Sequence, residues 1–243
     1  MRRGKIIFIT HSEHADPGAV ADGLHARGFA TEICCPMLGD SLPPLADGKP
    51  EGYDAAVVFG GPMGVGDAAE MAFLAEEIGW VSAQLERDSP LLGICLGAQM
   101  MAHALGAKVW EHPEEVREIG YHPVFAAPAG HGLFPERLIA YQWHREGFDM
   151  PADAELLATG EGGFRNQAFR HGANGYAVQF HPEMIPRTME RWVTSEKGAP
   201  QLGLPGAQPA ERQRAVAPKH DPVMRDWLDK FLALWLGTEP GAP

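Results

Sequence analysis

Residues 90–106 read Pro90-Leu91-Leu92-Gly93-Ile94-Cys95-Leu96-Gly97-Ala98-Gln99-Met100-Met101-Ala102-His103-Ala104-Leu105-Gly106. The first part is a short apolar run after a proline, which predicts a buried parallel strand. The second part, residues 98–105, predicts a helix that ends at Gly106. Cys95 falls at the junction, between Gly93 and Gly97. The pattern therefore predicts a sharp strand-to-helix turn with a cysteine at its tip, the cysteine analogue of a serine nucleophile elbow.

A cysteine at such a turn has two interpretations. Backbone N–H groups at a helix N-terminus carry roughly half a unit of positive charge, and this field favours the thiolate, which is the nucleophilic form. The flanking glycines let a substrate approach the backbone closely. The alternative is a structural thiol, because free cysteine is among the most frequently buried residue types. The rest of the chain has to distinguish the two.

The composition excludes several classes of function. The chain has 243 residues, enough for one large α/β domain, and its 20 Lys and Arg against 32 Asp and Glu give a net charge of −12. This charge and the lack of a basic run argue against nucleic acid or an anionic membrane surface as a partner. No apolar stretch approaches the roughly 18 residues of a spanning helix. Three cysteines form no disulfide framework, which predicts reduced thiols, with Cys34 and Cys35 buried, and a cytoplasmic location.

The first half of the sequence alternates strands and helices. Apolar runs predict strands over residues 5–10, 30–34, 54–59 and 91–94, and helical spacing predicts helices over 19–27 and 68–86. The pair Glu76-Glu77 on the second helix is interpreted as part of its solvated face. This alternation predicts an α/β fold with a mostly parallel twisted central sheet and helices on both faces.

The second half has a different pattern. Residues 109–125 and 155–180 are short runs broken by Gly and Pro, which predict a small antiparallel β region. Residues 176–180 are its strongest strand, and 185–195 predict a helix. Residues 197–218 are rich in Gly, Pro, Ala and Gln and predict a mobile loop, followed by a C-terminal helix over 219–237. We expect one domain over residues 1–243.

Two further groups complete a candidate catalytic constellation for Cys95. A thiol nucleophile needs a base, and the base needs an orienting group. His181 follows the strand 176–180, and Glu183 lies two residues later, on the same side of an extended chain. An oxyanion hole needs backbone N–H donors. Leu96 at the elbow offers one, and the turn Gly60-Gly61 after the third strand offers another.

The ordered motifs Phe59-Gly60-Gly61-Pro62, Gly93-Ile94-Cys95-Leu96-Gly97-Ala98-Gln99 and Gln179-Phe180-His181-Pro182-Glu183 resemble the class I glutamine amidotransferases, the triad glutaminase type with a flavodoxin-like fold. The resemblance covers residues 5–195. It implies that Cys95 attacks the γ-amide carbon of glutamine, forming a γ-glutamyl thioester and releasing ammonia. It also implies that His181 is general base and acid and that Glu183 orients it. Gly61 and Leu96 N–H would form the oxyanion hole, with Gly60 and Gln99 contacting the substrate.

One motif departs from the family. Members often have Ser-His or Asn-His before the final strands, where this chain has Gln142-Trp143-His144. Trp143 and His144 are therefore the candidate substrate-binding residues there. This form resembles the stand-alone GMP-synthase-like branch and relatives that act as γ-glutamyl peptidases. The substrate is either free glutamine or another γ-glutamyl compound, and no cofactor is expected. No acceptor machinery is visible, so ammonia would pass to a separate synthetase subunit or be released.

Three other interpretations remain open. A regulatory subunit without activity would keep the fold, but a decayed site would be expected to have lost part of the triad. A cysteine hydrolase of another α/β family predicts an acid between nucleophile and histidine in the chain, whereas Glu183 follows His181. The loop His11-Ser12-Glu13-His14 has spacing that a metal could use, without an evident third ligand; alternatively, His14 or neighbouring loop atoms line the cleft at the strand ends.

Overall fold

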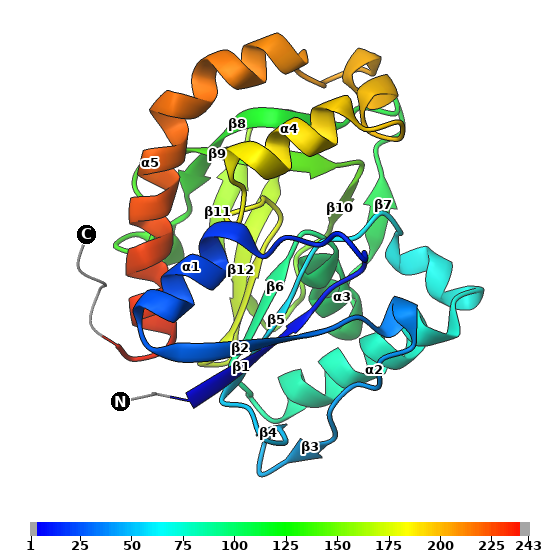
Figure 1. Cartoon of the computed structure of the whole chain (residues 1–243), viewed down its shortest axis with the longest axis vertical. Helices are drawn as coiled ribbons and strands as arrows, with labels where there is room; N and C mark the ends of the chain where they lie inside the picture. The colour runs from blue at the N-terminus through cyan, green and yellow to red at the C-terminus, as the bar shows by residue number, and fades with distance from the viewer. Residues whose placement is uncertain (1–3, 239–243) are drawn as a thin grey trace.

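The computed structural model describes residues 4–238; the ends of the expected 1–243 domain, residues 1–3 and 239–243, lie outside the described residues. The centre is a nine-stranded mixed sheet in the order β2-β1-β5-β6-β13-β12-β11-β8-β9 (Figure 1). The strands are β1 (Gly4–Ile9), β2 (Phe29–Cys34), β5 (Ala55–Val58), β6 (Leu91–Ile94), β8 (Glu118–Ala126), β9 (Arg137–His144), β11 (Ala154–Gly160), β12 (Asn166–His171) and β13 (Gly175–Val178).

The remaining elements surround this sheet. The helices are α1 (Gly18–Ala26), α2 (Ala72–Glu86), α3 (Leu96–Ala104), α4 (Pro186–Thr194) and α5 (Ala210–Trp235). Short 3-10 helices are η1 (Pro36–Leu38), η2 (Val65–Ala69), η3 (Pro128–Gly130) and η4 (Ala199–Gly203). Two antiparallel pairs stand apart from the sheet, β3 (Leu45–Ala46) with β4 (Lys49–Pro50) and β7 (Val109–Glu111) with β10 (Glu146–Phe148).

The predicted mixture of parallel and antiparallel strands is confirmed. Strands β2, β1, β5, β6 and β13 pair in parallel, and β12, β11, β8 and β9 continue the same sheet in antiparallel fashion. Strand β13 was expected within the antiparallel region. It pairs antiparallel with β12 but parallel with β6, with Val178 opposite Ile94. It therefore joins the two halves and brings the chain around residue 180 beside the chain around residue 95.

Helices cover both faces of the parallel half, as expected. Ile6 and Phe8 of β1 lie in a core with residues of α1 and α5, such as Leu24 and Phe231. The alternate residues Ile7 and Ile9 lie in a second core with residues of α2 and α3. Successive side chains of a strand point to opposite faces, so continuous apolar runs are what a sheet covered on both sides requires.

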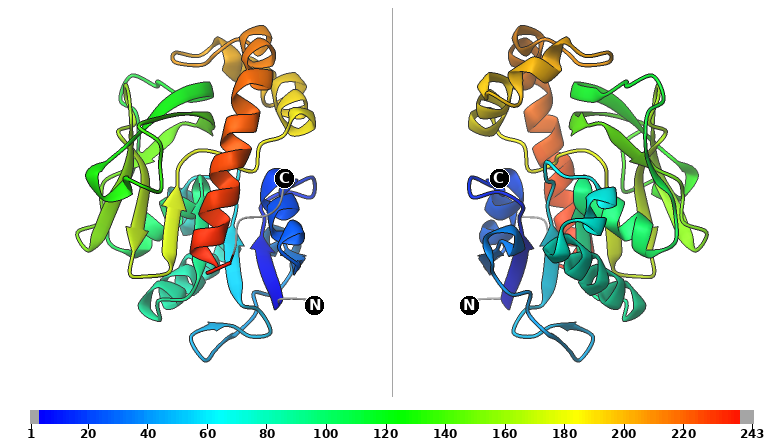
Figure 2. Two further views of the ribbon diagram at one scale, coloured as in Figure 1. Left: turned by 90° about the vertical axis from the view of Figure 1, so that its left-hand side faces the viewer. Right: turned by 90° about the vertical axis from the view of Figure 1, so that its right-hand side faces the viewer.

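The expectation of a mobile loop over residues 197–218 is wrong for its second half. Helix α5 begins at Ala210, and its buried side includes Gln213 and Ala217. Pro218 and Pro222 lie inside the helix on its exposed side. Each removes one backbone donor and favours a bend. Figures 1 and 2 show the bent helix running from beside β8 and β9 to beside α1.

None of the helices within residues 4–238 combines the length and the apolar character that crossing a membrane requires.

Candidate active site

Cys95 lies at a strained strand-to-helix turn, where the sequence predicted it. Its backbone has φ 53° and ψ −104°, a conformation that costs about 1–3 kcal/mol for a residue with a side chain. The turn connects β6 to α3, and the Cys95 N–H donates to the Val178 carbonyl of β13 at 2.9 Å. Gly97 allows this close packing, because a Cβ added there would lie 2.2 Å from the Val58 carbonyl oxygen. The side chain of Cys95 is therefore held at the carboxyl end of the sheet.

His181 and Glu183 form a buried pair just after β13. His181 Nδ1 lies 2.7 Å from Glu183 Oε1, and the two residues are 3% and 4% exposed. The His181 N–H donates to the Tyr141 carbonyl of β9 at 2.9 Å, which fixes the backbone beneath the imidazole. The carboxylate thus occupies one ring nitrogen and sets the ring's orientation.

The structure brings Cys95 and His181 together from adjacent strands. A Cβ added to Gly60 would lie 2.9 Å from His181 Cε1 and 3.4 Å from Cys95 Cβ, so both side chains flank one glycine. His181 Nε2 is buried and has no partner at normal hydrogen-bond geometry within residues 4–238. This nitrogen is therefore left available for the thiol or a substrate.

Electrostatics favour a protonated His181. Burial lowers the pKa of His181, but the charges of Glu183 and Cys95 and the hydrogen bond to Glu183 outweigh it and raise the pKa to about 10. The increase from the ordinary value of about 6.5 means that the imidazolium persists through neutral pH. The site therefore holds a buried imidazolium beside the Glu183 carboxylate and the Cys95 side chain.

Two backbone donors at this site are free of internal bonds. Within the described chain, neither the Gly61 N–H nor the Leu96 N–H donates to a backbone or side-chain acceptor. Leu96 is the first residue of α3, whose opening N–H groups have no intrahelical partner. A Cβ added to Gly61 would lie 2.8 Å from Leu96 Cδ2, so the two residues are neighbours. The arrangement can supply backbone donors to an anion beside Cys95.

The predicted substrate-binding side chains are held by protein groups. Gln99 donates through Nε2 to the Glu146 carbonyl at 3.1 Å and the Gln179 side chain at 3.3 Å. His144 uses Nδ1 on the Glu146 carbonyl at 2.9 Å and Nε2 on Glu118 at 3.1 Å. Both nitrogens of the His144 ring are therefore engaged, whereas Gln99 keeps its amide oxygen Oε1 as an acceptor for a substrate.

Trp143 contributes its backbone to the site and its ring to a wall. Its carbonyl oxygen lies 3.9 Å from Cys95 Sγ. Its ring packs edge-to-face on Trp192 of α4 at 5.5 Å, and Trp192 packs the same way on the His181 ring at 5.0 Å. Sequence reasoning missed Trp192, because nothing in the helix pattern of residues 185–195 indicates that this residue faces the imidazole.

The loop His11–His14 does not form a metal cluster in the part of the chain that the structure describes. His11 instead points inward, with Nε2 2.9 Å from Glu77 Oε1 and Nδ1 3.2 Å from the Gly60 carbonyl oxygen. Glu77 is fully buried, so its interpretation as a solvated residue is wrong, although Glu76 is exposed. Cys34 and Cys35 are buried and unpaired by disulfides, as expected.

Comparisons with known proteins agree with one another. Residues 29–197 match the family model described as glutamine amidotransferase class-I. The chain is 30% identical over 231 residues to the glutamine amidotransferase-like protein YfeJ of Salmonella typhimurium, covering 92% of this chain and 90% of that protein. It is 35% identical over 143 residues to a subunit of the glutamine-hydrolysing GMP synthase of Thermoplasma volcanium, covering 56% of this chain and 65% of that protein, slightly under two thirds.

The overall shape also has a solved counterpart. The crystal structure of a glutamine amidotransferase from Thermotoga maritima superimposes with a TM-score of 0.86 at 28% identity. The superposition covers 98% of this chain and 100% of that one.

Proposed function

Because this chain belongs to the class I glutamine amidotransferase family, we propose that it hydrolyses the γ-amide of glutamine through a γ-glutamyl thioester on Cys95. The observation that carries the proposal is that the Cys95 and His181 side chains lie together beside Gly60. A Cβ added to Gly60 would contact both of them. A thiol, an imidazole and a carboxylate in series are the parts that nucleophilic acyl transfer needs.

The proposed first half-reaction releases ammonia. The Cys95 thiolate attacks the γ-carbon, and the negative charge moves to the γ-oxygen, where the N–H groups of Gly61 and Leu96 stabilise it. The tetrahedral intermediate collapses as the C–N bond breaks. The His181 imidazolium gives its proton to the leaving nitrogen, which departs as ammonia. The γ-glutamyl group stays on sulfur as a thioester.

The proposed second half-reaction restores the thiolate. His181, now neutral, takes a proton from water as the oxygen attacks the thioester carbon. The same backbone donors stabilise the second oxyanion, and the C–S bond breaks to release glutamate. Glu183 holds Nδ1 throughout, so the imidazole keeps Nε2 toward the reacting atoms.

We propose that a separate synthetase subunit consumes the ammonia. The similarity to the Thermoplasma volcanium protein supports this assignment, because that protein is named as one subunit of a glutamine-hydrolysing GMP synthase.

A second candidate substrate is a γ-glutamyl peptide or conjugate. Trp143 replaces the small polar residue frequent in the family, and the His144 ring has both nitrogens bonded to protein. The place where the family grips the α-amino and carboxylate groups of glutamine therefore offers few free polar side chains. A larger γ-glutamyl compound would gain contact from the rings of Trp143 and Trp192.

Ammonia release from glutamine, and amine release from a panel of γ-glutamyl peptides, test these assignments. We expect wild-type turnover of at least one γ-glutamyl compound and loss of turnover in Cys95→Ala. Activity that survives Cys95→Ala would refute the mechanism. Activity on peptides without glutamine hydrolysis would select the second candidate. A preparation inactive on every compound, alone and with added synthetase, would refute both and leave the regulatory interpretation.

A further inference from the structure

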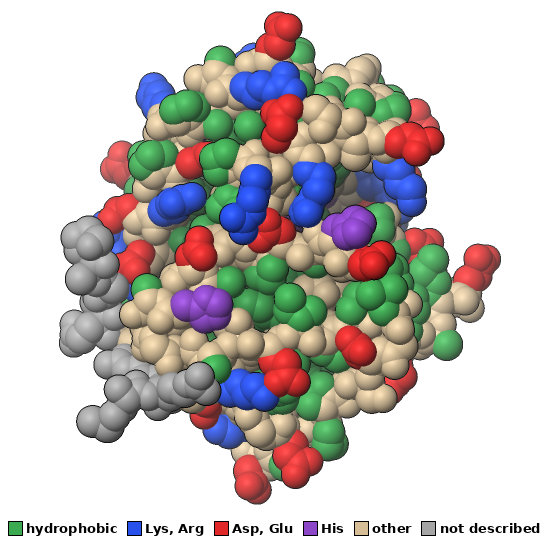
Figure 3. All heavy atoms as spheres, viewed as in Figure 1, with side chains coloured by type: hydrophobic (Ala, Val, Ile, Leu, Met, Phe, Trp, Pro, Cys, Tyr) green, Lys and Arg blue, Asp and Glu red, His purple; other side chains and the backbone are tan. Residues whose placement is uncertain are grey.

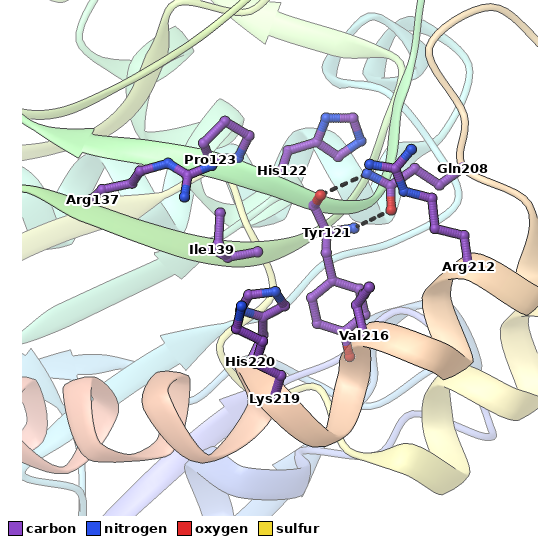
Figure 4. Close-up of a pocket in the computed structure, with 10 residues that line it drawn as sticks. All are labelled: Tyr121, His122, Pro123, Arg137, Ile139, Gln208, Arg212, Val216, Lys219 and His220. Carbon is purple, nitrogen blue, oxygen red and sulfur yellow. Dashed lines mark hydrogen bonds between the residues drawn. The ribbon is translucent and has the colours of Figure 1, made fainter.

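A second cavity of about 450 Å³ lies between strands β8 and β9 and helix α5, and none of the predicted catalytic residues lines it (Figure 4). Figure 4 shows side chains from both strands and from α5 arranged around Tyr121 and Ile139. The lining residues are Tyr121, His122, Pro123, Arg137, Ile139, Gln208, Arg212, Val216, Lys219 and His220.

The cavity gathers cations that have no internal counter-ion. Within residues 4–238, Arg137, Arg212 and Lys219 form no side-chain hydrogen bond or ion pair. Figure 3 shows most Lys and Arg side chains of the face that it draws lying over α4 and α5. Three uncompensated cations around one cavity create a local positive potential.

The two histidines of the cavity have lowered pKa values, mainly because they are buried. Burial and the charges of Lys219 and Arg137 lower the pKa of His220, against a smaller opposing effect of Asp221. Burial is also the main reason that the pKa of His122 is lowered, although Glu118 acts in the opposite direction. Both rings are therefore neutral near pH 7. The His122 ring donates through Nε2 to the Ile119 carbonyl at 3.2 Å, so its one N–H is used and only the His220 ring keeps a donor for an anion.

The floor of the cavity is apolar and rigidly held. Gln208 fixes the backbone of Tyr121 on both sides, with its amide donating to the carbonyl at 2.6 Å and accepting from the N–H at 3.1 Å. The Tyr121 hydroxyl donates to Asp221 at 2.6 Å. The ring of Tyr121 faces that of His220 at 5.9 Å. Ile139 completes an apolar surface beneath the cations.

We propose that this cavity binds a small phosphomonoester with a flat or apolar body. A phosphate carries up to two charges and several acceptor oxygens, which suits two arginines and a lysine better than a single carboxylate does. The body of the ligand would lie on Tyr121 and Ile139, where ring contact adds to the electrostatic attraction. The proposed site is separate from Cys95 and does not depend on the proposed hydrolase activity.

Isothermal titration of the full chain with phenyl phosphate tests the proposal. We expect saturable binding that weakens as NaCl rises, because exposed cations are screened by salt. Benzoate, inorganic phosphate and phenol should each bind more weakly, since each lacks part of the phosphate–ring combination. If benzoate bound more tightly than phenyl phosphate, the ligand class would be an aromatic carboxylate, and the proposed phosphomonoester would be wrong.

A double variant Arg137→Gln, Lys219→Gln should lose at least about tenfold in affinity for phenyl phosphate. The double variant Lys108→Gln, Arg165→Gln is the matched control, because it removes the same charge from residues that do not line this cavity. Equal loss in both pairs would show a general charge effect and overturn the site. Absence of saturable binding to the wild type would overturn it directly.

A second, independent observation concerns the other side of the Gly60-Gly61 turn. His11 and Glu77 are both completely buried and 2.9 Å apart, and His11 Nδ1 reaches the Gly60 carbonyl oxygen at 3.2 Å. A Cβ added to Gly61 would lie 2.8 Å from His11 Cβ. The turn therefore passes between His11 and the Cys95–His181 junction.

From this contact we infer that His11 and Glu77 are positioning residues for the oxyanion hole. In a trans peptide the carbonyl and the following N–H point in opposite directions. With His11 donating through Nδ1 to the Gly60 carbonyl, the Gly61 N–H is directed away from His11, toward the catalytic side. Glu77 Oε1 lies 2.9 Å from Nε2 and fixes the orientation of the ring. This inference rests on the proposed hydrolase function.

Steady-state kinetics of His11→Leu and His11→Asn on the best γ-glutamyl substrate test this role. We expect His11→Leu to lower kcat by about 100-fold with a much smaller change in KM, as loss of an oxyanion donor does. His11→Asn keeps a donor near the position of Nδ1 and should restore most of kcat. A purely structural role for His11 would instead lower thermal stability in both variants without that rescue.

Glu77→Gln has a matched control in Glu76→Gln, whose side chain is exposed on the same helix. Only the buried variant should lower kcat. If the wild type is active and His11→Leu keeps its kcat, the positioning role is wrong while the hydrolase function stands. If the wild type is inactive on every γ-glutamyl compound, it is the hydrolase function that fails.

Discussion

His181 Nδ1 and Glu183 Oε1 are 2.7 Å apart in the interior of the protein, and only Pro182 separates the two residues in the chain. The carboxylate that keeps the His181 imidazole protonated therefore comes from two residues further along the same chain segment. The carboxylate compensates for the cost of burying a cation, which would otherwise favour the neutral ring.

Replacing Glu183 with Gln should move the basic limb of the pH profile to lower pH. Glu183 and Cys95 hold the pKa of His181 at about 10, and without the carboxylate the effect of burial gains weight. We expect the basic limb of the kcat/KM profile to move to lower pH by at least about one unit. A profile of Glu183→Gln that overlays the wild type would contradict this account.

The same pKa predicts a pH dependence of folding. Because the folded value of about 10 lies above the unfolded value of about 6.5, the contribution is complete below pH 6.5 and is lost as pH rises through 10. Urea unfolding between these limits should show wild-type stability falling with pH more steeply than that of Glu183→Gln. Parallel curves would argue against the raised pKa.

Cys95→Gly should be inactive but more stable than Cys95→Ala. Alanine keeps the strain of φ 53° and ψ −104°, whereas glycine adopts positive φ freely, so the glycine variant should gain about 1–3 kcal/mol over alanine. Chemical denaturation of the two variants measures the difference. Greater stability of the alanine variant would mean that the turn relaxes when the thiol is removed.

Gly60→Ala should reduce turnover by displacing the His181 imidazole. The new Cβ would lie 2.9 Å from His181 Cε1, whereas at Gly66 it would meet no atom within 4 Å. Neither glycine has a positive φ. A difference between the two alanine variants therefore reports steric crowding by the new Cβ and not backbone strain. We expect kcat to fall in Gly60→Ala and to stay near wild type in Gly66→Ala, with both proteins folded by circular dichroism.

Cys34 should resist alkylation in the native protein. Burial, together with the charges of Asp40 and Glu77, raises the pKa of its thiol to about 11. At pH 8 only about one thousandth of such a thiol is ionised, and the thiolate is the reacting form. Peptide mass spectrometry after iodoacetamide treatment should find Cys34 unmodified in buffer and modified in urea. Rapid labelling of the folded protein would show that this region opens.

The sequence could predict the elements that rest on local pattern. The apolar runs of β1 and β6, the elbow at Cys95 and the proximity of His181 to Glu183 all follow from residues close together in the chain. The start of α5 could not be predicted in this way. Pro218 and Pro222 argue against a helix locally, but packing of the opposite side of α5 against the sheet outweighs them.

Contacts between residues far apart in the chain could not be predicted from the sequence either. Glu77 lies in a helix whose pattern does not distinguish it from exposed Glu76, and its burial depends on His11 from another element. Trp192 faces His181 only because α4 packs over β9, the strand that carries both Tyr141 and Trp143. Such pairings are set by tertiary packing, which a single-sequence pattern does not encode.

The parallel pairing of β6 with β13 has a mechanical consequence. Cys95 directly follows β6, and His181 lies three residues beyond Val178, the last paired residue of β13, which accepts from the Cys95 N–H itself. The Cys95 and His181 side chains cannot move apart unless the central strands separate, and central strands are the last parts of a protein to open locally. On heating, turnover and far-ultraviolet ellipticity should therefore be lost at the same temperature. There should be no temperature range in which the protein is folded but inactive.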